Sequence, residues 1–198
     1  KSFYNSLNNI KDLSKEKEYA VSVSGGVDSN TLLFLLNSWT KKRKKKLTVI
    51  YFNHNLRKDS QKDYLLVKKM SSDFSLKCIL LNWNEKPSTA ILEKARIARY
   101  QAISKYCKKN SIHSLFTGHH ADDVAETVAM RIFSNSSIDG LCPIIKERHL
   151  FGIKLIRPML ELRKKQIYAF AKENNIKFIE DPSNKNTKTL RAKIRSYL

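Results

Sequence analysis

The sequence has few acidic residues for its size. Its 198 residues include 18 Asp and Glu against 38 Lys and Arg, which leaves a formal net charge of +20. Drift in base composition explains why Lys is used in preference to Arg, but it does not explain the shortage of acids. A surface with this charge attracts polyanions and repels cationic partners, so it favours nucleic acid or an anionic membrane surface as the partner class.

Cysteines and long apolar runs are also scarce. Cys78, Cys107 and Cys142 are odd in number and widely spaced, which argues against a disulfide framework, a C-x-x-C motif and a cysteine-based metal site. No apolar stretch approaches the roughly 20 residues that a membrane span needs. We therefore expect a reducing compartment, a cytoplasmic location and no membrane partner. The chain begins at Lys1, which leaves open whether residues upstream were removed.

The pattern of apolar and polar residues predicts an α/β fold. Apolar strands are predicted at residues 19–23, 47–52, 78–81, 114–117 and 153–156. Helices are predicted between and after them, with a buried one starting at about residue 31 and others at about 60–71, 88–109, 121–133 and 161–174. Strands that are apolar throughout and alternate with helices predict a doubly wound, mainly parallel sheet with helices on both faces.

The length suits a single domain. We expect its core at about residues 19–160 and a helical, basic extension at about 161–198, with a last short strand at 177–180 and a basic helix at 189–198. The basic run KKRKKK at 41–46 joins the first helix of the fold to the second strand. It is either a solvated loop or a patch that contacts phosphates.

Glycine is rare, with five in the chain, so the adjacent pair within SGGVDS at residues 24–29 stands out. This segment lies between a predicted strand and a predicted helix, where backbone N–H groups and the helix N-terminus form an anion site. The glycines let the main chain approach a phosphate, and Ser24 and Ser29 add hydroxyl groups. The motifs G-x-x-x-x-G-K-[ST] and G-x-G-x-x-G are both absent. Asp28 beside bound phosphates implies a bridging Mg²⁺ or a direct polar contact.

The hexapeptide resembles the S-G-G-x-D-S pyrophosphate loop of the ATP-pyrophosphatases, also called PP-loop enzymes. Further segments resemble, in chain order, the signatures of the tRNA(Ile)-lysidine synthetase family: NHNLR at 53–57, ARIARY at 95–100, GHHADDVAET at 118–127, IRPML at 156–160 and DPSN at 181–184. The likeness runs from about residue 19 to residue 195. It implies an adenine-nucleotide alpha hydrolase-like fold with ATP and Mg²⁺ as cofactors.

The same resemblance implies a carbon–nitrogen ligase. Family members join free lysine to C2 of the wobble cytidine in the CAU anticodon of tRNA(Ile), so that the tRNA reads AUA as Ile. The reaction passes through an adenylated cytidine and converts ATP to AMP and pyrophosphate.

Acidic residues gather after the fourth predicted strand. In a helix over residues 121–133, Asp122 and Glu126 are neighbours at i and i+4 and Asp123 lies beside them. These acids either stabilise the helix dipole or supply, through Asp122 or Asp123, a second Mg²⁺ contact opposite Asp28. The second interpretation follows because the loops after parallel strands open at the same edge of the sheet.

Two further groups have a chemical interpretation. One of the adjacent His119 and His120 would deprotonate the amine of lysine or stabilise charge on the leaving AMP, because imidazole titrates near neutral pH. On the helix at 88–109, Glu93, Arg96 and Tyr100 form one stripe, which is either an internal ion pair or part of the crevice wall. The resemblance favours the crevice for Arg96.

The motif positions and the resemblance together give a set of expected site residues. The catalytic group comprises Asp28, Arg96, His119, Asp122 and Asp123, of which Asp28, Asp122 and Asp123 would hold the metal. The nucleotide group comprises Ser24, Gly25, Gly26, Val27, Asp28, Ser29, His54 and Gly118. The group for tRNA or lysine comprises Glu126, Arg131, Arg157, Asp181, Asn184, Arg191 and Arg195. The carboxylates that would recognise lysine remain unranked among Asp122, Asp123, Glu126, Glu180 and Asp181.

Three departures from the family pattern keep alternatives open. Residues 134–137 read SNSS where the family has R-G-S-G, so that Arg131 would have to supply the missing charge, and Ala192 stands where the family has Asn. The chain ends at Leu198, where members commonly continue into domains that help hold tRNA, so it is either an excised catalytic domain or a short form.

Two competing functions follow. One is another PP-loop enzyme that thiolates a tRNA base or amidates a small acid, although cluster-dependent thiolation would need a group of cysteines. The other is a non-catalytic basic RNA-binding module, which the intact Asp28 and the complete GHHADD segment argue against.

Overall fold

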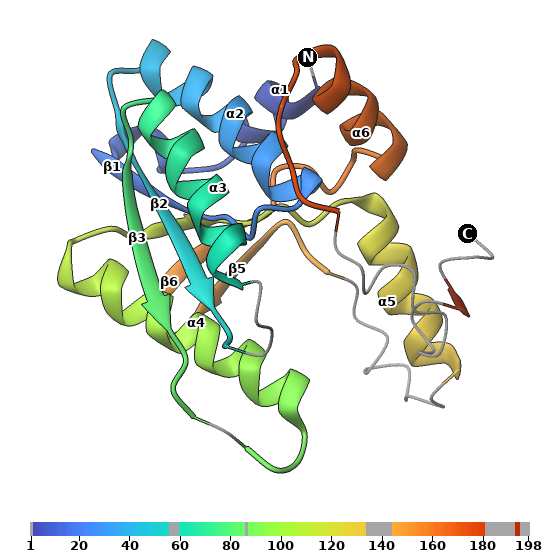
Figure 1. Ribbon diagram of the computed structural model, residues 1–198. Helices are drawn as coiled ribbons and strands as arrows, with labels where there is room; N and C mark the ends of the chain where they lie inside the picture. The colour runs from blue at the N-terminus through green and yellow to red at the C-terminus, as the bar shows by residue number, and fades with distance from the viewer. Residues whose placement is uncertain (1, 56–59, 86, 134–143, 181–192, 195–198) are drawn as a thin grey trace.

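The computed structural model describes residues 2–55, 60–85, 87–133, 144–180 and 193–194, and it contains a sheet with helices on both sides (Figure 1). The helices are α1 (Ser2–Asn8), η1 (Leu13–Lys15), α2 (Val27–Lys42), α3 (Ser60–Asp73), α4 (Ile91–Lys109), α5 (Ala121–Phe133) and α6 (Lys164–Glu173). The strands are β1 (Glu18–Ser22), β2 (Lys46–Asn53), β3 (Lys77–Asn82), β4 (Ser114–Phe116), β5 (Glu147–Leu150) and β6 (Ile153–Ile156).

The six strands form one sheet in the order β3-β2-β1-β4-β6-β5. All neighbours are parallel except β5, which pairs antiparallel with β6 at one edge. The direction of winding reverses between β1 and β4, because β2 lies on one side of β1 and β4 on the other. Ligands of such sheets bind outside the carboxyl ends of the strands at this switch point. The predicted doubly wound, mainly parallel sheet is confirmed.

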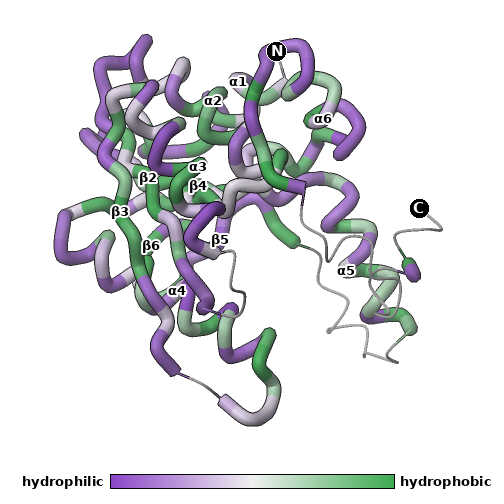
Figure 2. Tube along the Cα trace, in the orientation of Figure 1, coloured by the Kyte–Doolittle hydropathy of each residue, from purple (hydrophilic) through white to green (hydrophobic). Residues whose placement is uncertain are grey.

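The central strands are apolar on both faces because both faces are covered. Tyr19 and Val21 of β1 point into the core beneath α2, α3 and α6, whereas Ala20 points into the core beneath α4. All three are fully buried, as are Leu32 and Leu33 of α2. Burying each such large side chain contributes about 1.5–3 kcal/mol. Figure 2 shows hydrophobic and hydrophilic positions alternating along the helices, as expected for helices that cover a sheet with one face.

The packed core extends beyond residues 19–160 at both ends. Phe3 and Leu7 of α1 belong to the same apolar cluster as Ile167 and Ala171 of α6, together with Ile176. α1 and α6 therefore pack into the domain with the central strands.

Several local predictions differ from the structure. Residues 177–180 do not form the predicted strand. The backbone N–H of Ile179 donates to the Gly25 carbonyl in the loop after β1, and the Lys177 carbonyl accepts from the side chain of Asn30 in the first turn of α2. The structure also contains α1, η1 and β5, which the sequence pattern does not predict. The helix predicted at 189–198 lies outside the described residues apart from 193–194, which are helical. Within the described part of the chain, no helix is both long and apolar enough to cross a membrane.

Candidate active site

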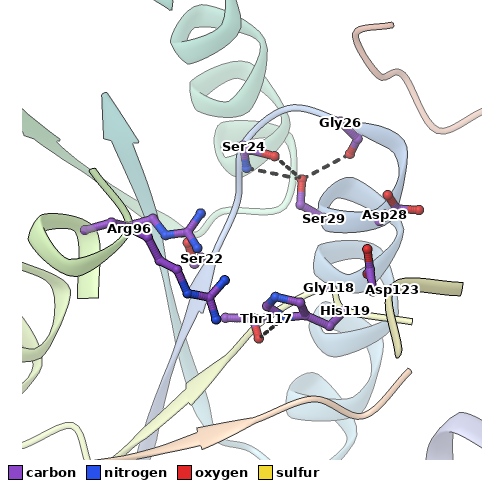
Figure 3. Close-up of a pocket in the computed structure, with 11 residues that line it drawn as sticks. Ser22, Ser24, Gly26, Asp28, Ser29, Arg96, Thr117, Gly118, His119 and Asp123 are labelled. Atoms are coloured by element: carbon purple, nitrogen blue, oxygen red, sulfur yellow. Dashed lines mark hydrogen bonds between the residues drawn. The ribbon is translucent and has the colours of Figure 1, made fainter. Parts of the chain in front are cut away.

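A pocket of about 300 Å³ opens at the switch point between β1 and β4 (Figure 3). Its walls come from the end of β1 and the loop after it, from the turn between β4 and α5, and from the first half of α4. The lining residues are Ser22, Ser24, Gly26, Asp28, Ser29, Arg96, Arg99, Thr117, Gly118, His119 and Asp123. Three segments far apart in the sequence thus meet in one cavity.

The loop after β1 closes on itself and ends at the N-terminus of α2. Ser29 donates its Oγ hydrogen to the carbonyl of Gly26 (3.0 Å), and the backbone N–H of Ser24 donates to Ser29 Oγ (3.1 Å). Gly25 has a φ of 91°, a left-handed conformation that side chains rarely adopt. The first turn of α2 faces the pocket, so its partial positive charge favours an anion there.

A distant segment supports this loop from behind. The side-chain amide of Asn30, fully buried, donates to the carbonyls of Gly25 (3.0 Å) and Lys177 (2.8 Å). The backbone N–H of Ile179 donates to the Gly25 carbonyl (2.9 Å). The loop conformation therefore depends on residues that follow α6.

The turn after β4 places a buried imidazole among three carboxylates. His120, 1% exposed, has its Nε2 at 3.7 Å from Asp28 Oδ2 and 3.5 Å from Asp123 Oδ2, and its Nδ1 at 3.5 Å from Asp122 Oδ2. Burial alone would lower the pKa of His120, but the hydrogen bond to Asp28 and the charges of Asp123 and Asp28 outweigh burial and raise that pKa. An imidazolium here offsets the repulsion between the carboxylates.

The opposite side of the pocket is cationic. Arg96 and Arg99 of α4 line it, and their guanidinium carbons lie 5.5 and 4.8 Å from the ring centre of Tyr100. Arg157, 4% exposed, follows β6 and donates from Nη1 to the carbonyl of Ile145 (2.6 Å). Burial of this guanidinium lowers the pKa of Arg157, although the nearby Tyr100 opposes that shift.

His119 lies beside these arginines and is neutral in the free protein. Its Nδ1 is 3.0 Å from Thr117 Oγ1. Burial first, then the charges of Arg157, Arg99 and Arg96, lower the pKa of His119 to about 3. An imidazole with this pKa carries no positive charge at neutral pH, so stabilisation of negative charge by a His119 imidazolium does not fit the ligand-free site.

Comparison with known proteins agrees with this geometry. Residues 1–198 match the family model described as the PP-loop domain. The chain belongs to the PP-loop family. Among curated relatives of this PP-loop domain, the tRNA(Ile)-lysidine synthase of Orientia tsutsugamushi is 32% identical over 200 residues, covering 99% of this chain and 44% of the relative. That of Wolbachia pipientis wMel is 38% identical over 184 residues, covering 91% and 43%. The chain therefore spans less than half the length of these two relatives.

Solved structures share the PP-loop fold. The U34-tRNA thiolase NcsA from Methanococcus maripaludis, solved with its [4Fe-4S] cluster, aligns with a TM-score of 0.82 at 18% identity, over 99% of this chain and 70% of its own. The NH3-dependent NAD synthetase from Campylobacter jejuni aligns with a TM-score of 0.54 at 14% identity, over 98% and 80%. At these identities the likeness shows the fold alone, and it agrees with the predicted alpha hydrolase-like architecture.

The structure brings two of the three predicted metal ligands into the pocket. Asp28 and Asp123 line it, whereas Asp122 lies outside and accepts a hydrogen bond at Oδ2 from the backbone N–H of Lys164 (2.7 Å). Burial would raise the pKa of Asp122, but this bond and the charge of His120 lower it. Asp122 thus caps the first turn of α6, a role that the sequence did not suggest because Lys164 is 42 residues away.

The pair that remains fits Mg²⁺ bound together with phosphates. Among the described residues there is no group of three or more His, Cys, Asp or Glu that could hold a metal ion by itself. Mg²⁺ usually takes one or two carboxylates and completes its shell with substrate phosphates and water. Oδ1 of Asp28 is buried without a hydrogen-bond partner among the described residues, so a cation or a donor from a ligand would satisfy it.

The remaining predicted residues fall into three groups. Ser24, Gly26, Ser29, Arg96, Gly118 and His119 line the pocket. Described residues that do not line it are Gly25, Val27, His54, Glu126, Arg131 and Arg157, of which Glu126 is 1% exposed on α5. Asp181, Asn184, Arg191 and Arg195 lie outside the described residues.

Of the stripe on α4, Arg96 lines the pocket, whereas Glu93 and Tyr100 do not. Glu93 is exposed and forms no ion pair with Arg96 within the described part of the chain, whereas Arg96 faces the PP-loop. Ser22, Arg99 and Thr117 also line the pocket and were not selected from the sequence. The sequence does contain a pattern that indicates Arg99 as a pocket residue, because Arg99 follows Arg96 at i+3 and therefore lies on the same side of the helix.

Proposed function

We propose that this chain is the nucleotide-binding catalytic domain of a tRNA(Ile)-lysidine synthase. The observation that carries the proposal is the single pocket that SGGVDS, ARIARY and GHHADD line together. Relatives at 32% and 38% identity bear that enzyme name, which supports the same substrates here: ATP, free lysine and tRNA(Ile) with a CAU anticodon. The charge of +20 is consistent with a polyanionic substrate.

The proposed reaction has two steps. In the first, the C2 oxygen of the wobble cytidine attacks the α-phosphorus of ATP, and pyrophosphate leaves. In the second, the unprotonated ε-amine of lysine attacks C2, the C2–O bond breaks and AMP leaves, so that a C–N bond replaces a C–O bond. The pocket contributes by holding the reacting atoms close together and correctly oriented, which lowers the activation free energy by several kcal/mol.

Each part of the pocket has a task in this scheme. The N-terminus of α2 and the hydroxyls of Ser24 and Ser29 would bind the phosphates of ATP. Asp28 and Asp123 would hold Mg²⁺, which when bound neutralises phosphate charge. His120 would keep these two carboxylates in place through the contacts described above.

Cluster-dependent thiolation fits this chain less well. Iron–sulfur clusters are generally held by cysteine thiolates, and four is the usual number. The chain has three cysteines. Cys78 packs against the apolar cluster on one face of the sheet and Cys107 is buried in the cluster on the other face, so these two cannot share a cluster site.

The test is lysine incorporation into RNA. The chain is incubated with Mg-ATP, radiolabelled lysine and a tRNA(Ile) transcript with a CAU anticodon, beside a transcript with U at the wobble position. We expect acid-insoluble label that requires ATP and the wobble C. AMP formation without label would point to another PP-loop substrate. Bound RNA with no AMP would contradict catalysis by this domain alone.

Asp28→Ala provides the matching variant. We expect it to abolish adenylation and leave RNA binding largely intact, because Asp28 lies at the phosphate end of the pocket. Asp73→Ala is the control, since Asp73 is an exposed carboxylate at the far end of α3. Loss of RNA binding with normal adenylation would overturn the role given to Asp28.

A further inference from the structure

Two arginines line one side of the pocket, and a third, buried arginine lies near them. Arg96 and Arg99 come from α4 and Arg157 follows β6. Their charges reach the same point, because each of them lowers the pKa of His119. In the part of the chain that the structure describes, none of the three forms an ion pair with Asp or Glu. We call Arg96, Arg99 and Arg157 the arginine wall.

The geometry holds these cations in place despite their mutual repulsion. The guanidinium groups of Arg96 and Arg99 lie over the ring of Tyr100, which is itself 3% exposed. Arg157 is held by its bond to Ile145, while its Nε is buried without a hydrogen-bond partner among the described residues. A buried donor and a cluster of like charges are both costly unless an anion satisfies them.

The arginine wall is separate from the anion site of the PP-loop. Figure 3 shows Arg96 on the opposite side of the pocket from Asp28 and Asp123. The PP-loop binds phosphate through the α2 N-terminus and hydroxyls, whereas the wall offers guanidinium forks, which suit phosphate oxygens. The pocket thus has two sets of anion-binding donors, the guanidinium groups on one side and the α2 N-terminus with its hydroxyls on the other, where the carboxylates also lie.

We propose that the arginine wall binds a backbone phosphate of the RNA next to the reacting nucleotide, and that Arg99 is one of its direct contacts. The proposal rests on the proposed function for the identity of the RNA. A phosphate held there would place the adjoining base between the wall and the nucleotide on the PP-loop. The arginine wall would then position the acceptor, and the PP-loop would position ATP.

The test separates RNA binding from nucleotide binding. The affinity of the chain for a short RNA hairpin with a CAU loop is measured between about 50 and 200 mM salt, and its affinity for a non-hydrolysable ATP analogue with Mg²⁺ is measured separately. For Arg99→Gln we expect RNA binding to weaken about tenfold or more, because a charge-assisted hydrogen bond is lost. The slope of log affinity against log salt should fall by about 0.7–0.9, and affinity for the analogue should be unchanged.

Two further variants serve as controls. Arg99→Lys keeps the charge but loses the fork, so it should keep the salt slope and recover part of the affinity. Lys109→Gln removes an exposed cation in the last turn of the same helix, about 15 Å along α4 from Arg99. It should change neither affinity, and melting temperatures show whether each variant is folded.

The outcomes decide between assignments. Weaker binding of the ATP analogue with an unchanged salt slope for RNA would assign Arg99 to the nucleotide and overturn the proposal. Equal losses of RNA affinity for Arg99→Gln and Lys109→Gln would mean that only the overall positive charge of the protein attracts the RNA, which also overturns the proposal. If the wild-type chain binds the hairpin through Arg99 but incorporates no lysine, the proposed function fails and the phosphate site stands. A wild-type chain that does not bind the hairpin refutes the phosphate site.

Discussion

Replacing Gly118 by Ala should disturb the pocket through a backbone contact. A Cβ at position 118 would lie 3.1 Å from the carbonyl carbon and oxygen of Asp28 and 3.2 Å from the backbone nitrogen of Ser29. Ordinary contacts of this kind are about 3.5–4.0 Å, so the β4–α5 turn and the first turn of α2 must separate by a few tenths of an ångström. Both sides are main chain and cannot rotate away. Overpacking of this kind costs about 1–3 kcal/mol.

The assay combines thermal unfolding with nucleotide binding. Each kcal/mol of destabilisation should lower the melting temperature by about 2–4 °C for a domain of this size. Affinity for an ATP analogue should fall by about tenfold as the α2 N-terminus shifts, the equivalent of one charge-assisted hydrogen bond. Gly26→Ala is the control for stability, because its Cβ would meet only Ser24 Oγ, at 3.8 Å. Equal melting temperatures for Gly118→Ala and wild type would refute the reasoning.

Two other predictions concern charge and capping. His119 takes up a proton below about pH 6.5 in the unfolded chain but only below about pH 3 in the folded one, because its pKa is lowered to about 3. Between these two values the free energy of unfolding therefore falls by about 1.4 kcal/mol for each unit by which the pH is lowered. Urea unfolding at about pH 7 and at about pH 5 measures this effect. The free energy of unfolding should fall by about 2 kcal/mol less for His119→Gln than for the wild-type chain between the two pH values, and equal falls would contradict the prediction. Asp122→Ala should cost about 1 kcal/mol by removing the cap on Lys164, seen as a lower melting temperature with unchanged binding of Mg-ATP analogue; weaker metal-dependent binding would make Asp122 a ligand after all.

Much of the fold could be predicted because the strands that form its centre are apolar throughout. The helix at 121–133 and the strand at 153–156 have the predicted bounds. The missed strand β5, ERHL, is at the edge of the sheet and has no buried residue, so it has no apolar pattern to detect. The segment at 177–180 has the composition of a strand, but its hydrogen bonds go to Gly25 of the PP-loop and to the side chain of Asn30 in α2. Composition alone does not identify the partner of a backbone group.

The candidate site was predictable where motif and topology agree. The loop SGGVDS and Gly118 lie at the carboxyl ends of β1 and β4, and parallel strands bring such ends together. Asp122 and Asp123 could not be separated from sequence, since adjacent helical residues point about 100° apart and packing decides which enters the pocket. Arg157 meets the α4 arginines only through the pairing of β6 with β4. The difference between His119 and His120 also depends on burial and on neighbours from three segments.

The support behind the PP-loop has a consequence for synthesis of the chain. The carbonyl of Gly25 accepts from the backbone N–H of Ile179, and the side-chain amide of Asn30 donates to the carbonyl of Lys177, about 150 positions later. A ribosome-bound chain that stops short of these residues contains every lining residue of the pocket and the local bonds of its phosphate loop, but it lacks the two bonds that support the loop from behind. We therefore expect nucleotide binding to emerge late during translation, in one step, when residue 179 has left the exit tunnel. Nucleotide binding is then a reporter of completed folding.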